Sequence, residues 1–331
     1  MKSIKQTLMS GAMILALSFV FTSCDDILGE WDKPAPNPVV PTPTPEPEPE
    51  PTPIPGLLTG KFTINASGDK IQFSQGNLQA TYDGTKWTWA FAEHQWDYIG
   101  GRSDGGSEPE TGNNYINGNG TVSAAGTVDL FGWVGESSTV LTSDPAKYGI
   151  SNSITLNDYG TNSSDALKND WGNTIGTGWR TLTGGAGGEW RYLLEFRTTG
   201  GTVFGTASAR YAHATINTDG TPVNGLILFP DGVDIADSEV TTAGTVNGTS
   251  AWGTECTSAQ WTALAAKGCV FLPAAGRRTG TTVNEANNGY YWSSSNSEYA
   301  HNVDFGSSNI SYSTSSYRYR GCSVRLVRDV E

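Results

Sequence analysis

The chain has 331 residues and a formal charge of −13, with 20 Lys and Arg against 33 Asp and Glu. This balance argues against a nucleic-acid partner, because a nucleic-acid-binding surface needs clustered basic side chains. The 41 Gly, 13 Tyr and 11 Trp, with few long runs of helix formers, favour strands and irregular loops over a helical bundle. We therefore expect a mixed α+β fold that is rich in loops.

Residues 1–23 are predicted to be an export signal. A basic start is followed by an apolar stretch from about Leu8 to Phe21, which is shorter than a typical membrane-spanning helix. The small residue before Cys24 resembles the bacterial lipoprotein processing site, which implies cleavage before Cys24 and lipidation of this residue. The alternative is an ordinary signal peptide. The following Asp25-Asp26 resembles the export signal that sends Bacteroidota lipoproteins to the outer face of the outer membrane.

Residues 24–56 are predicted to form a stalk. The stretch 33–55 holds 11 of the 16 prolines of the chain. Alternating Pro fixes the backbone and removes hydrogen-bond donors, so neither helix nor sheet can form there. At about 3.1 Å per residue, a polyproline II segment of this length reaches about 70 Å. A spacer between the lipid anchor and a globular domain fits this composition better than a ligand for aromatic grooves.

The globular domain is expected to span residues 57–331, and it opens with strand patterns. Apolar and polar side chains alternate in 62–64, 71–74 and 78–82, and Asp83-Gly84 makes a turn before the strand 86–91. Later strands are predicted at 211–216, 225–230 and 270–273. Residues 100–127 carry turn residues without periodicity and are expected to form a long loop, which needs bracing. We expect core aromatic side chains to pack beneath this loop: Trp96, Tyr98, Phe131, Trp133, Trp171 and Trp179.

Two short helices are predicted. The first covers 188–197, with Trp190, Leu193, Leu194 and Arg197 on one face. The second covers 257–264, where Thr257 or Ser258 caps the start and Gly268 ends the helix.

The C-terminal run is unusually rich in three residue types, because 21 of the 34 residues from Ala286 to Tyr319 are Asn, Ser or Tyr. Tyr supplies a large contact area at low entropic cost, and Ser and Asn supply adaptable hydrogen bonds, as in antibody loops. Period-two alternation predicts that Val303 and Phe305 face inward and that Asn302 and Asp304 are exposed. Ile310 and Tyr312 are expected to lean inward by the same rule.

We therefore predict a ligand-binding surface within residues 296–319, whose unknown partner is a protein or a glycan. Tyr299 and His301 share the parity of Val303 and are included as contacts at the start of a strand. Trp292, Val324, Leu326 and Val327 are expected to be scaffold. The alternative is a polar β-meander without a binding role. The candidate residues are Asn296, Ser297, Glu298, Tyr299, His301, Asn302, Asp304, Ser307, Ser308, Asn309, Ser311, Ser313, Ser315, Tyr317 and Tyr319.

Four segments together resemble one family. They are 189–197, 271–277 (FLPAAGR), 289–295 (GYYWSSS) and 321–327 (GCSVRLV). This family is the Fibrobacter succinogenes major paralogous domain type, a branch of the C-type lectin-like fold related to formylglycine-generating enzymes. The resemblance covers residues from about 57 to the end. A tail this rich in Asn, Ser and Tyr also resembles the variable proteins of diversity-generating retroelements, which implies a ligand-binding surface diversified on a fixed scaffold.

Convergent reactive groups are not found in the sequence, so we predict a binding protein without catalytic residues, cofactor or metal. The enzymatic relatives use paired cysteines near the C-terminus, whereas Cys322 lies alone in that region. Cys269 and Cys322 are expected to be two buried thiols or one disulfide. His94, His213 and His301 lack metal-ligand spacing, and the calcium-binding motifs of classical lectins are missing. A structural cell-surface subunit or adhesin is the alternative to a diversified binder, ahead of an enzyme.

Arg277-Arg278 and Arg318/Arg320 are short basic pairs. We expect them to be salt-bridge partners and not a track for phosphate groups.

Overall fold

The computed structural model describes residues 53–100, 113, 125–133, 170–218, 220–279, 282–284, 287–297, 299–318 and 320–330. The predicted export signal, Cys24, nearly all of the predicted stalk and most of the predicted loop 100–127 lie outside these residues. Within the described ranges, no helix combines the length and apolar character that a membrane span requires.

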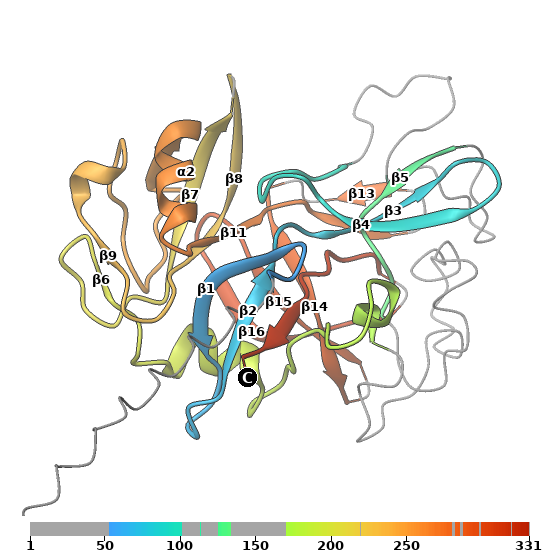
Figure 1. Cartoon of the computed structure of the whole chain (residues 1–331), viewed down its shortest axis with the longest axis horizontal. Coiled ribbons are helices and arrows are strands. Elements are labelled where there is room, and N and C mark those ends of the chain that lie inside the picture. Colours follow the sequence, from blue (N-terminus) through green and yellow to red (C-terminus); the bar gives the residue numbers. More distant parts are fainter. Residues whose placement is uncertain are drawn as a thin grey trace, which may run out of the picture. The chain divides into compact units, whose positions relative to one another are not determined.

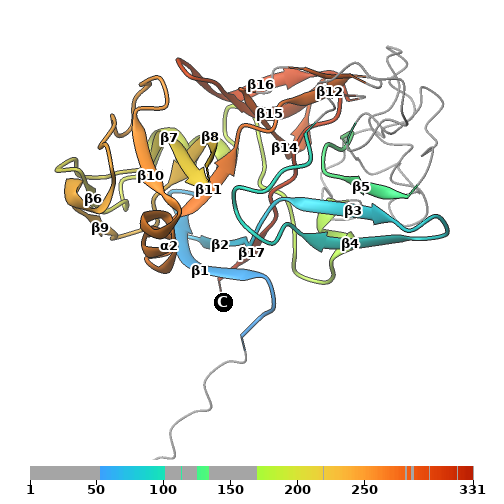
Figure 2. The same cartoon turned by 90° about the horizontal axis from the view of Figure 1, so that it is seen from above.

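The described strands form four sheets of three or four strands and two strand pairs (Figures 1 and 2). The first sheet has the order β1 (Leu57–Thr63), β2 (Lys70–Ser74), β17 (Val327–Asp329). The second has the order β4 (Trp87–Phe91), β3 (Leu78–Tyr82), β5 (Gly126–Val128). The third has the order β10 (Thr254–Thr257), β7 (Tyr211–Thr218), β8 (Thr221–Leu228), β11 (Val270–Pro273).

The fourth sheet has the order β14 (Gly289–Asn296), β15 (Ala300–Phe305), β16 (Ile310–Ser316), and all of its pairings are antiparallel. The pairs are β12 (Arg277–Thr279) with β13 (Thr282–Asn284) and β6 (Thr202–Val203) with β9 (Asp234–Ile235). Strands were thus predicted at the right places for β1 to β4, β7, β8 and β11, whereas β5 takes the end of the predicted loop.

The described helices are all short. They are the 3-10 helices η4 (Trp171–Thr174) and η6 (Asp237–Glu239), the single turn α1 (Glu189–Arg191), the π-helical turn η5 (Tyr192–Phe196) and α2 (Ser258–Ala266). Small sheets with a few short helices agree with the α+β class expected from the sequence.

Helix α2 confirms the second predicted helix, and its ends follow from local chemistry. The Thr257 hydroxyl accepts a hydrogen bond from the backbone N–H of Gln260 at 3.2 Å, and the Gln260 side chain accepts one from the backbone N–H of Thr257 at 2.9 Å. This reciprocal pair satisfies two donors at the start of the helix. Gly268, with φ of 88°, ends the helix in the left-handed region that Gly adopts without a steric penalty.

The first predicted helix consists of α1 followed directly by η5. Arg197 N–H donates to the carbonyl of Tyr192 at 2.8 Å, five residues back, so the last turn is wider than an α-helical turn. Trp190, Leu193, Leu194 and Arg197 are all buried, which confirms their predicted common face.

Most of the predicted core aromatic residues are buried. Phe131, Trp133, Trp171 and Trp179 are at most 6% exposed. Trp96 is half-buried, and Tyr98 is 38% exposed, so its assignment to the core was wrong. Tyr98 follows a short turn-rich segment after β4, where an amphipathic ring can lie at the surface.

The sheet β14–β15–β16 separates two hydrophobic clusters. Tyr290, Trp292 and Ala300 belong to a cluster that also holds Trp133, Cys322 and Val324. Tyr291, Val303 and Phe305 belong to a second cluster, with Leu182, Trp190 and Val327. Successive side chains of a strand point to opposite faces. Core packing therefore covers both faces of the central strand β15.

Candidate ligand-binding surface

The strand β15 has Trp292 opposite Asn302 and Tyr291 opposite Val303 on its β14 side. Its pairing is irregular on both sides, because the register shifts between Trp292 and Asn296 on β14 and between Asn302 and Asp304 along β15. Such bulges bend a strand and redirect side chains. Simple alternation therefore does not hold along the whole sheet.

Asn302 is the clearest error among the predicted contacts, because it is 1% exposed. Alternation placed it opposite to Val303 correctly, but the face it occupies is covered by the cluster around Trp292 and Cys322. Its Nδ2 donates to the carbonyl of Val303 at 3.4 Å, and its Oδ1 has no hydrogen-bond partner. Asn302 is thus a scaffold position that lies within the predicted surface.

The other candidates within the described ranges remain at least partly accessible. Glu298 and Tyr319 lie outside the described residues. Exposed positions are Ser297, Ser308, Asn309 and Ser315. Half-buried positions are Asn296, Tyr299, His301, Asp304, Ser307, Ser311, Ser313 and Tyr317. The predicted exposure of Asp304 is therefore only partly correct.

The expected frame of this surface is buried. Each of these residues is at most 1% exposed: Trp292, Val303, Phe305, Val324, Leu326 and Val327. Two buried indole N–H groups are also satisfied by backbone carbonyls. Trp292 Nε1 donates to Phe131 at 2.6 Å and Trp133 Nε1 donates to Ser293 at 2.8 Å, which ties β14 to the segment 131–133.

One group of candidates lies where β14 turns into β15. The rings of Tyr299 and Tyr317 meet edge to face, with centroids 5.3 Å apart and an interplanar angle of 79°. The backbone N–H of Ser297 donates to the carbonyl of Tyr299 at 2.9 Å. Arg318, which is almost fully buried, donates from Nη2 to the carbonyl of Ser297 at 3.3 Å. These bonds hold the turn and its two half-buried rings in place. We call Asn296, Ser297, Tyr299, Ser315 and Tyr317 the tyrosine-pair surface.

A second group lies at the opposite end of β15. Gly306 N–H donates to the carbonyl of Asn309 at 3.0 Å and closes the turn that contains Ser307 and Ser308. The Asn309 carbonyl also lies 3.3 Å from Nε2 of the buried His213. At about 3.3 Å per residue, the eight steps from Tyr299 to Ser307 span roughly 26 Å. The predicted contacts therefore form two separate groups and not one small patch.

His301 takes a third position, on the same face as Val303. Its Cβ lies 2.9 Å from the point where a Cβ on Gly184 would be, so only Gly fits beside it. The Ser293 hydroxyl donates to the His301 carbonyl at 2.8 Å, and Gly184 N–H donates to Oγ of Ser295 at 3.0 Å. Burial lowers the pKa of His301. This half-buried imidazole is held against the loop before α1.

Sequence reasoning missed a basic residue beside the tyrosine pair. The guanidinium carbon of Arg320 lies 5.2 Å from the centre of the Tyr317 ring. Among the described residues, no acidic side chain forms an ion pair with Arg320. The only signal in the sequence was the nearness of Tyr317 and Arg320, which are three residues apart. The turn that brings them together has the Arg320 N–H donating to the Tyr317 carbonyl at 3.1 Å.

The three cysteines in the described ranges offer no activated thiol. Cys256, Cys269 and Cys322 are free and buried, which fits the expectation of buried thiols and excludes the alternative disulfide between Cys269 and Cys322. Burial raises the pKa of Cys256 and of Cys322 to about 12, and it raises the pKa of Cys269 as well. A reactive cysteine needs the opposite shift. Within the described ranges, no group of three or more His, Cys, Asp or Glu could hold a metal ion.

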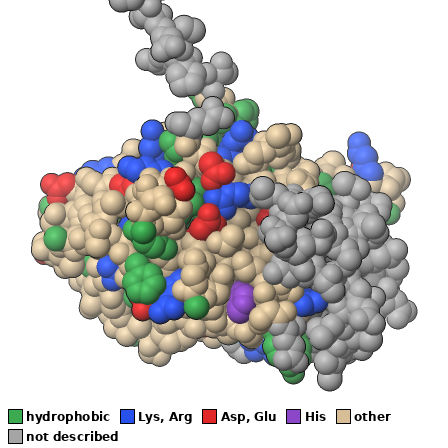
Figure 3. All heavy atoms as spheres, turned by 90° about the horizontal axis from the view of Figure 1, so that it is seen from below, with side chains coloured by type: hydrophobic (Ala, Val, Ile, Leu, Met, Phe, Trp, Pro, Cys, Tyr) green, Lys and Arg blue, Asp and Glu red, His purple; other side chains and the backbone are tan. Residues whose placement is uncertain are grey.

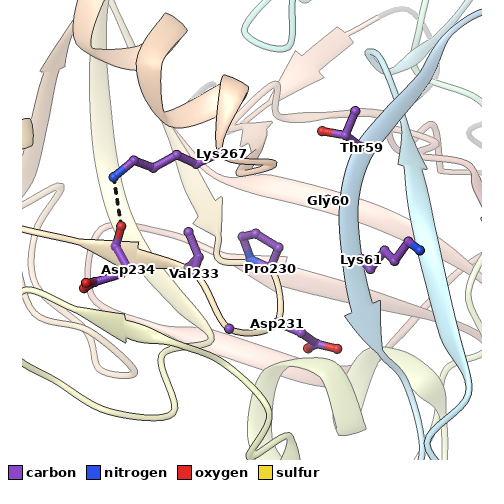
Figure 4. A pocket seen from close by; sticks show the side chains of 9 residues that line it. Thr59, Gly60, Lys61, Pro230, Asp231, Val233, Asp234 and Lys267 are labelled. Atoms are coloured by element: carbon purple, nitrogen blue, oxygen red, sulfur yellow. Dashed lines mark hydrogen bonds between the residues drawn. The ribbon is translucent and has the colours of Figure 1, made fainter.

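Three hollows lined by described residues include none of the predicted contacts. One of about 520 Å³ is lined by residues that include Lys61, Pro230, Asp231 and Lys267 (Figure 4). Figure 4 shows Lys267 directed toward Asp234 and Lys61 directed away from it. Lys267 Nζ donates to the Asp234 carbonyl at 2.8 Å and also binds Glu239. Lys267 in this hollow is therefore already paired.

Charges on another face are intermixed. Figure 3 shows acidic and basic side chains gathered next to one another on the face seen from below. Arg180 is an example of a basic residue that pairs with acidic neighbours. Arg180 Nη1 lies 2.8 Å from Glu189 Oε2, and its Nη2 lies 2.6 Å from Asp329 Oδ1.

No family model, curated protein or solved structure matches the chain.

Proposed function

We propose that the chain is a binding protein that recognises a protein or glycan ligand through the C-terminal sheet. The observation that carries the proposal is the half-buried pair Tyr299 and Tyr317 at the end of β15. The two rings contact each other, and the Tyr317 ring also contacts Arg320 and the core cluster. Ser and Asn are frequent among the neighbouring candidates in the sequence. Rigid Tyr rings beside adaptable polar groups are typical of recognition surfaces.

We further propose that the scaffold is C-type lectin-like and related to the Fibrobacter succinogenes major paralogous domain type. Support comes from the burial of the expected frame residues on both sides of β14–β15–β16. The proposal also includes diversification of this sheet by a retroelement. Its test is the flanking DNA, which must hold a near-copy of the end of the coding sequence that differs mainly at adenines, beside a reverse transcriptase gene. If the near-copy and the reverse transcriptase gene are missing, the diversification proposal fails and only the binding proposal remains.

The display of this domain at the cell surface is part of the same proposal. Lipidated Cys24 would anchor the chain in the outer membrane, and the Pro-rich stalk would hold the domain away from the lipid. Growth with a radioactive fatty acid should label the wild-type chain and not Cys24→Ser. Protease added to intact cells should remove the domain from the wild type. A labelled Cys24→Ser chain contradicts the anchor, and a protected domain contradicts surface display.

The enzymatic alternative has its own test, because Cys322 is buried in the structure. An enzyme of the formylglycine-generating type needs an accessible cysteine, so a native Cys322 that reacts with a thiol reagent would favour the enzymatic alternative. A structural subunit would instead be purified in a stable complex, because its C-terminal run would contact a neighbouring protein.

Binding is tested with the wild-type chain on a printed array of glycans and a printed array of extracellular proteins. We expect hits that disappear for the double variant Tyr299→Ala/Tyr317→Ala. A matched control is Tyr82→Ala, because Tyr82 is also half-buried and lies 5.2 Å from an aromatic ring, that of Trp87, in another sheet. Hits that both variants retain would contradict the proposed surface.

A further inference from the structure

The side chains of Arg277 and Arg320 lie on one face of a short strand pairing. Arg278 N–H donates to the Gly321 carbonyl at 2.8 Å, and Gly321 N–H donates to the Arg278 carbonyl at 2.9 Å. This reciprocal pair fixes an antiparallel bridge. The residue before each partner, Arg277 on one strand and Arg320 on the other, therefore points to the opposite face. Such diagonal neighbours are about 7–8 Å apart and within reach of long side chains.

Each of these two arginines stacks on a tyrosine of the C-terminal sheet. The Arg277 guanidinium carbon lies 4.8 Å from the Tyr290 ring centre, and that of Arg320 lies 5.2 Å from the Tyr317 ring centre. Both arginines are half-buried. Stacking fixes the plane of a guanidinium group and leaves its edge, which carries the N–H donors, for a planar anion.

The Arg320 guanidinium has no acidic partner among the described residues. Its Nε is buried and makes no hydrogen bond, and no described acidic residue pairs with it. A charged side chain that is taken partly out of water without a partner is costly. An anionic ligand at the accessible part of the Arg320 guanidinium lowers this cost, although it does not reach the buried Nε. Arg277 carries a second positive charge on the same face, and it also has other contacts.

The position of Arg320 connects this charge to the tyrosine-pair surface. The Tyr317 ring contacts Arg320 on one side and Tyr299 on another. A ligand seated on the two tyrosines therefore meets the Arg320 guanidinium directly.

The neighbouring sheet edge indicates which class of ligand carries the anion. β16 is an edge strand of its sheet, and among the described residues no backbone hydrogen bond reaches its outer side. An extended polypeptide is a partner that can pair with such an edge, and a glycan is not. The Tyr, Ser and Asn composition is likewise typical of surfaces that bind proteins.

We propose that Arg320, assisted by Arg277, forms an anion subsite that binds a carboxylate side chain of a protein ligand. The inference rests on the proposed binding function and names the chemistry of its partner. Asp or Glu on an extended segment of the ligand accepts N–H hydrogen bonds from the Arg320 guanidinium. The binding strength then depends on salt, because the contact is between charges near the surface.

The test uses the full chain and a capped peptide of alternating Glu and Gly, with a Gln and Gly peptide as the uncharged probe. We expect binding of the Glu peptide only, weakened about tenfold in Kd by Arg320→Gln, as for the loss of one charged hydrogen bond. Arg328→Gln is the matched control, because Arg328 is half-buried, stacks 5.6 Å from the Trp179 ring centre and belongs to another sheet. Its Kd should equal that of the wild type.

Three outcomes would overturn the inference. Equal binding of the Gln peptide removes the need for an anion, and equal weakening by Arg320→Gln and Arg328→Gln removes the site. Binding of an oligogalacturonate without binding of the Glu peptide assigns the anion to a glycan instead. The array hits keep the two proposals apart. If Tyr299→Ala/Tyr317→Ala abolishes hits that Arg320→Gln retains, the binding surface stands and the subsite fails.

Discussion

Asn302 lies opposite Trp292 in the pairing of β14 with β15, and both side chains are buried. Asn302 keeps one polar atom, Oδ1, without a partner in a cluster of aromatic and sulfur-containing side chains. This position belongs to the framework of the C-terminal sheet, although its sequence neighbourhood is that of a binding loop.

Substitutions at Asn302 should change stability and leave the surface intact. Asn302→Asp places an unpaired carboxylate in the cluster and should lower the free energy of unfolding by about 3 kcal/mol or more at neutral pH. Asn302→Leu has a similar volume and removes an unsatisfied polar atom, so it should cost less than about 1 kcal/mol or stabilise the domain. Urea unfolding measures both. An Asp variant as stable as the wild type would show that water reaches this site.

The buried pair Arg197 and Asp231 should be essential for stability. Arg197 is 0% exposed, and its Nη1 lies 2.9 Å from Asp231 Oδ1. Burial alone raises the pKa of the Asp231 carboxyl, but hydrogen bonds from two threonine hydroxyls and from Arg197 outweigh it, so the pKa lies below its ordinary value. Asp231→Asn leaves the buried guanidinium without its counter-charge and should cost about 3 kcal/mol.

The same pair predicts a direction for acid sensitivity. Because the folded-state pKa of Asp231 is lowered, its stabilisation is complete above the ordinary value of 3.8 and is lost as the pH falls through the folded-state pKa. The wild type should therefore lose more stability than Asp231→Asn between about pH 5 and pH 2. Unfolding midpoints in urea at a series of pH values measure this difference. Parallel curves for the two proteins would contradict a lowered pKa of the Asp231 carboxyl group in the folded state.

His213 should make the domain less stable in mild acid. Its Nδ1 lies 3.2 Å from the Gly248 carbonyl and its Nε2 lies 3.3 Å from the Asn309 carbonyl, yet burial outweighs these contacts and lowers its pKa. A lowered folded-state pKa means that the unfolded chain binds more protons below the ordinary value of 6.5, so stability falls as the pH drops through that value.

The measurement for His213 is the melting temperature at about pH 7.5 and about pH 5, on either side of the ordinary His pKa. The wild type should melt lower at the acid pH, and His213→Gln should show a smaller difference. His301 has a pKa shifted in the same direction, so the double variant with His301→Gln should show the smallest difference. A melting temperature that rises in mild acid would contradict the prediction.

The three buried thiols should be unreactive in the folded domain. In a Cys24→Ser background, a thiol reagent at pH 8 should detect none of Cys256, Cys269 and Cys322 before unfolding and all three in concentrated guanidinium. Rapid labelling of one thiol in the native protein would show an accessible cysteine, and peptide mapping would identify it.

Local signals allowed much of the fold to be predicted. Helix α2 was predicted from Thr257 and Gly268, because capping and helix termination depend on residues only a few positions apart. The strands β1 to β4 likewise follow from alternation and from the Asp83-Gly84 turn. Pairings between distant segments, such as β17 with β2 and the parallel β10 with β7, have no local signal and were not predicted.

The candidate site was predicted less well for a related reason. Alternation gives the two faces of a strand, but it does not say which face is covered by another part of the chain. For β15 both faces are covered, by clusters assembled from segments as distant as Leu78 and Val324. Asn302 was therefore misassigned, whereas residues in the turns, such as Ser308 and Asn309, were correctly expected at the surface.

The central claim is that the tyrosine-pair surface binds a ligand. Its most direct test is the Kd of Tyr299→Ala/Tyr317→Ala for a hit from the arrays, measured together with its melting temperature. We predict a Kd at least about 30-fold weaker than that of the wild type, as for the loss of one interface hot spot. The melting temperature should fall by no more than about 5 °C, because Tyr317 is only partly buried against the cluster around Trp133 and Trp292. A wild-type Kd, or a loss of binding that follows a collapse of the melting temperature, would contradict the claim.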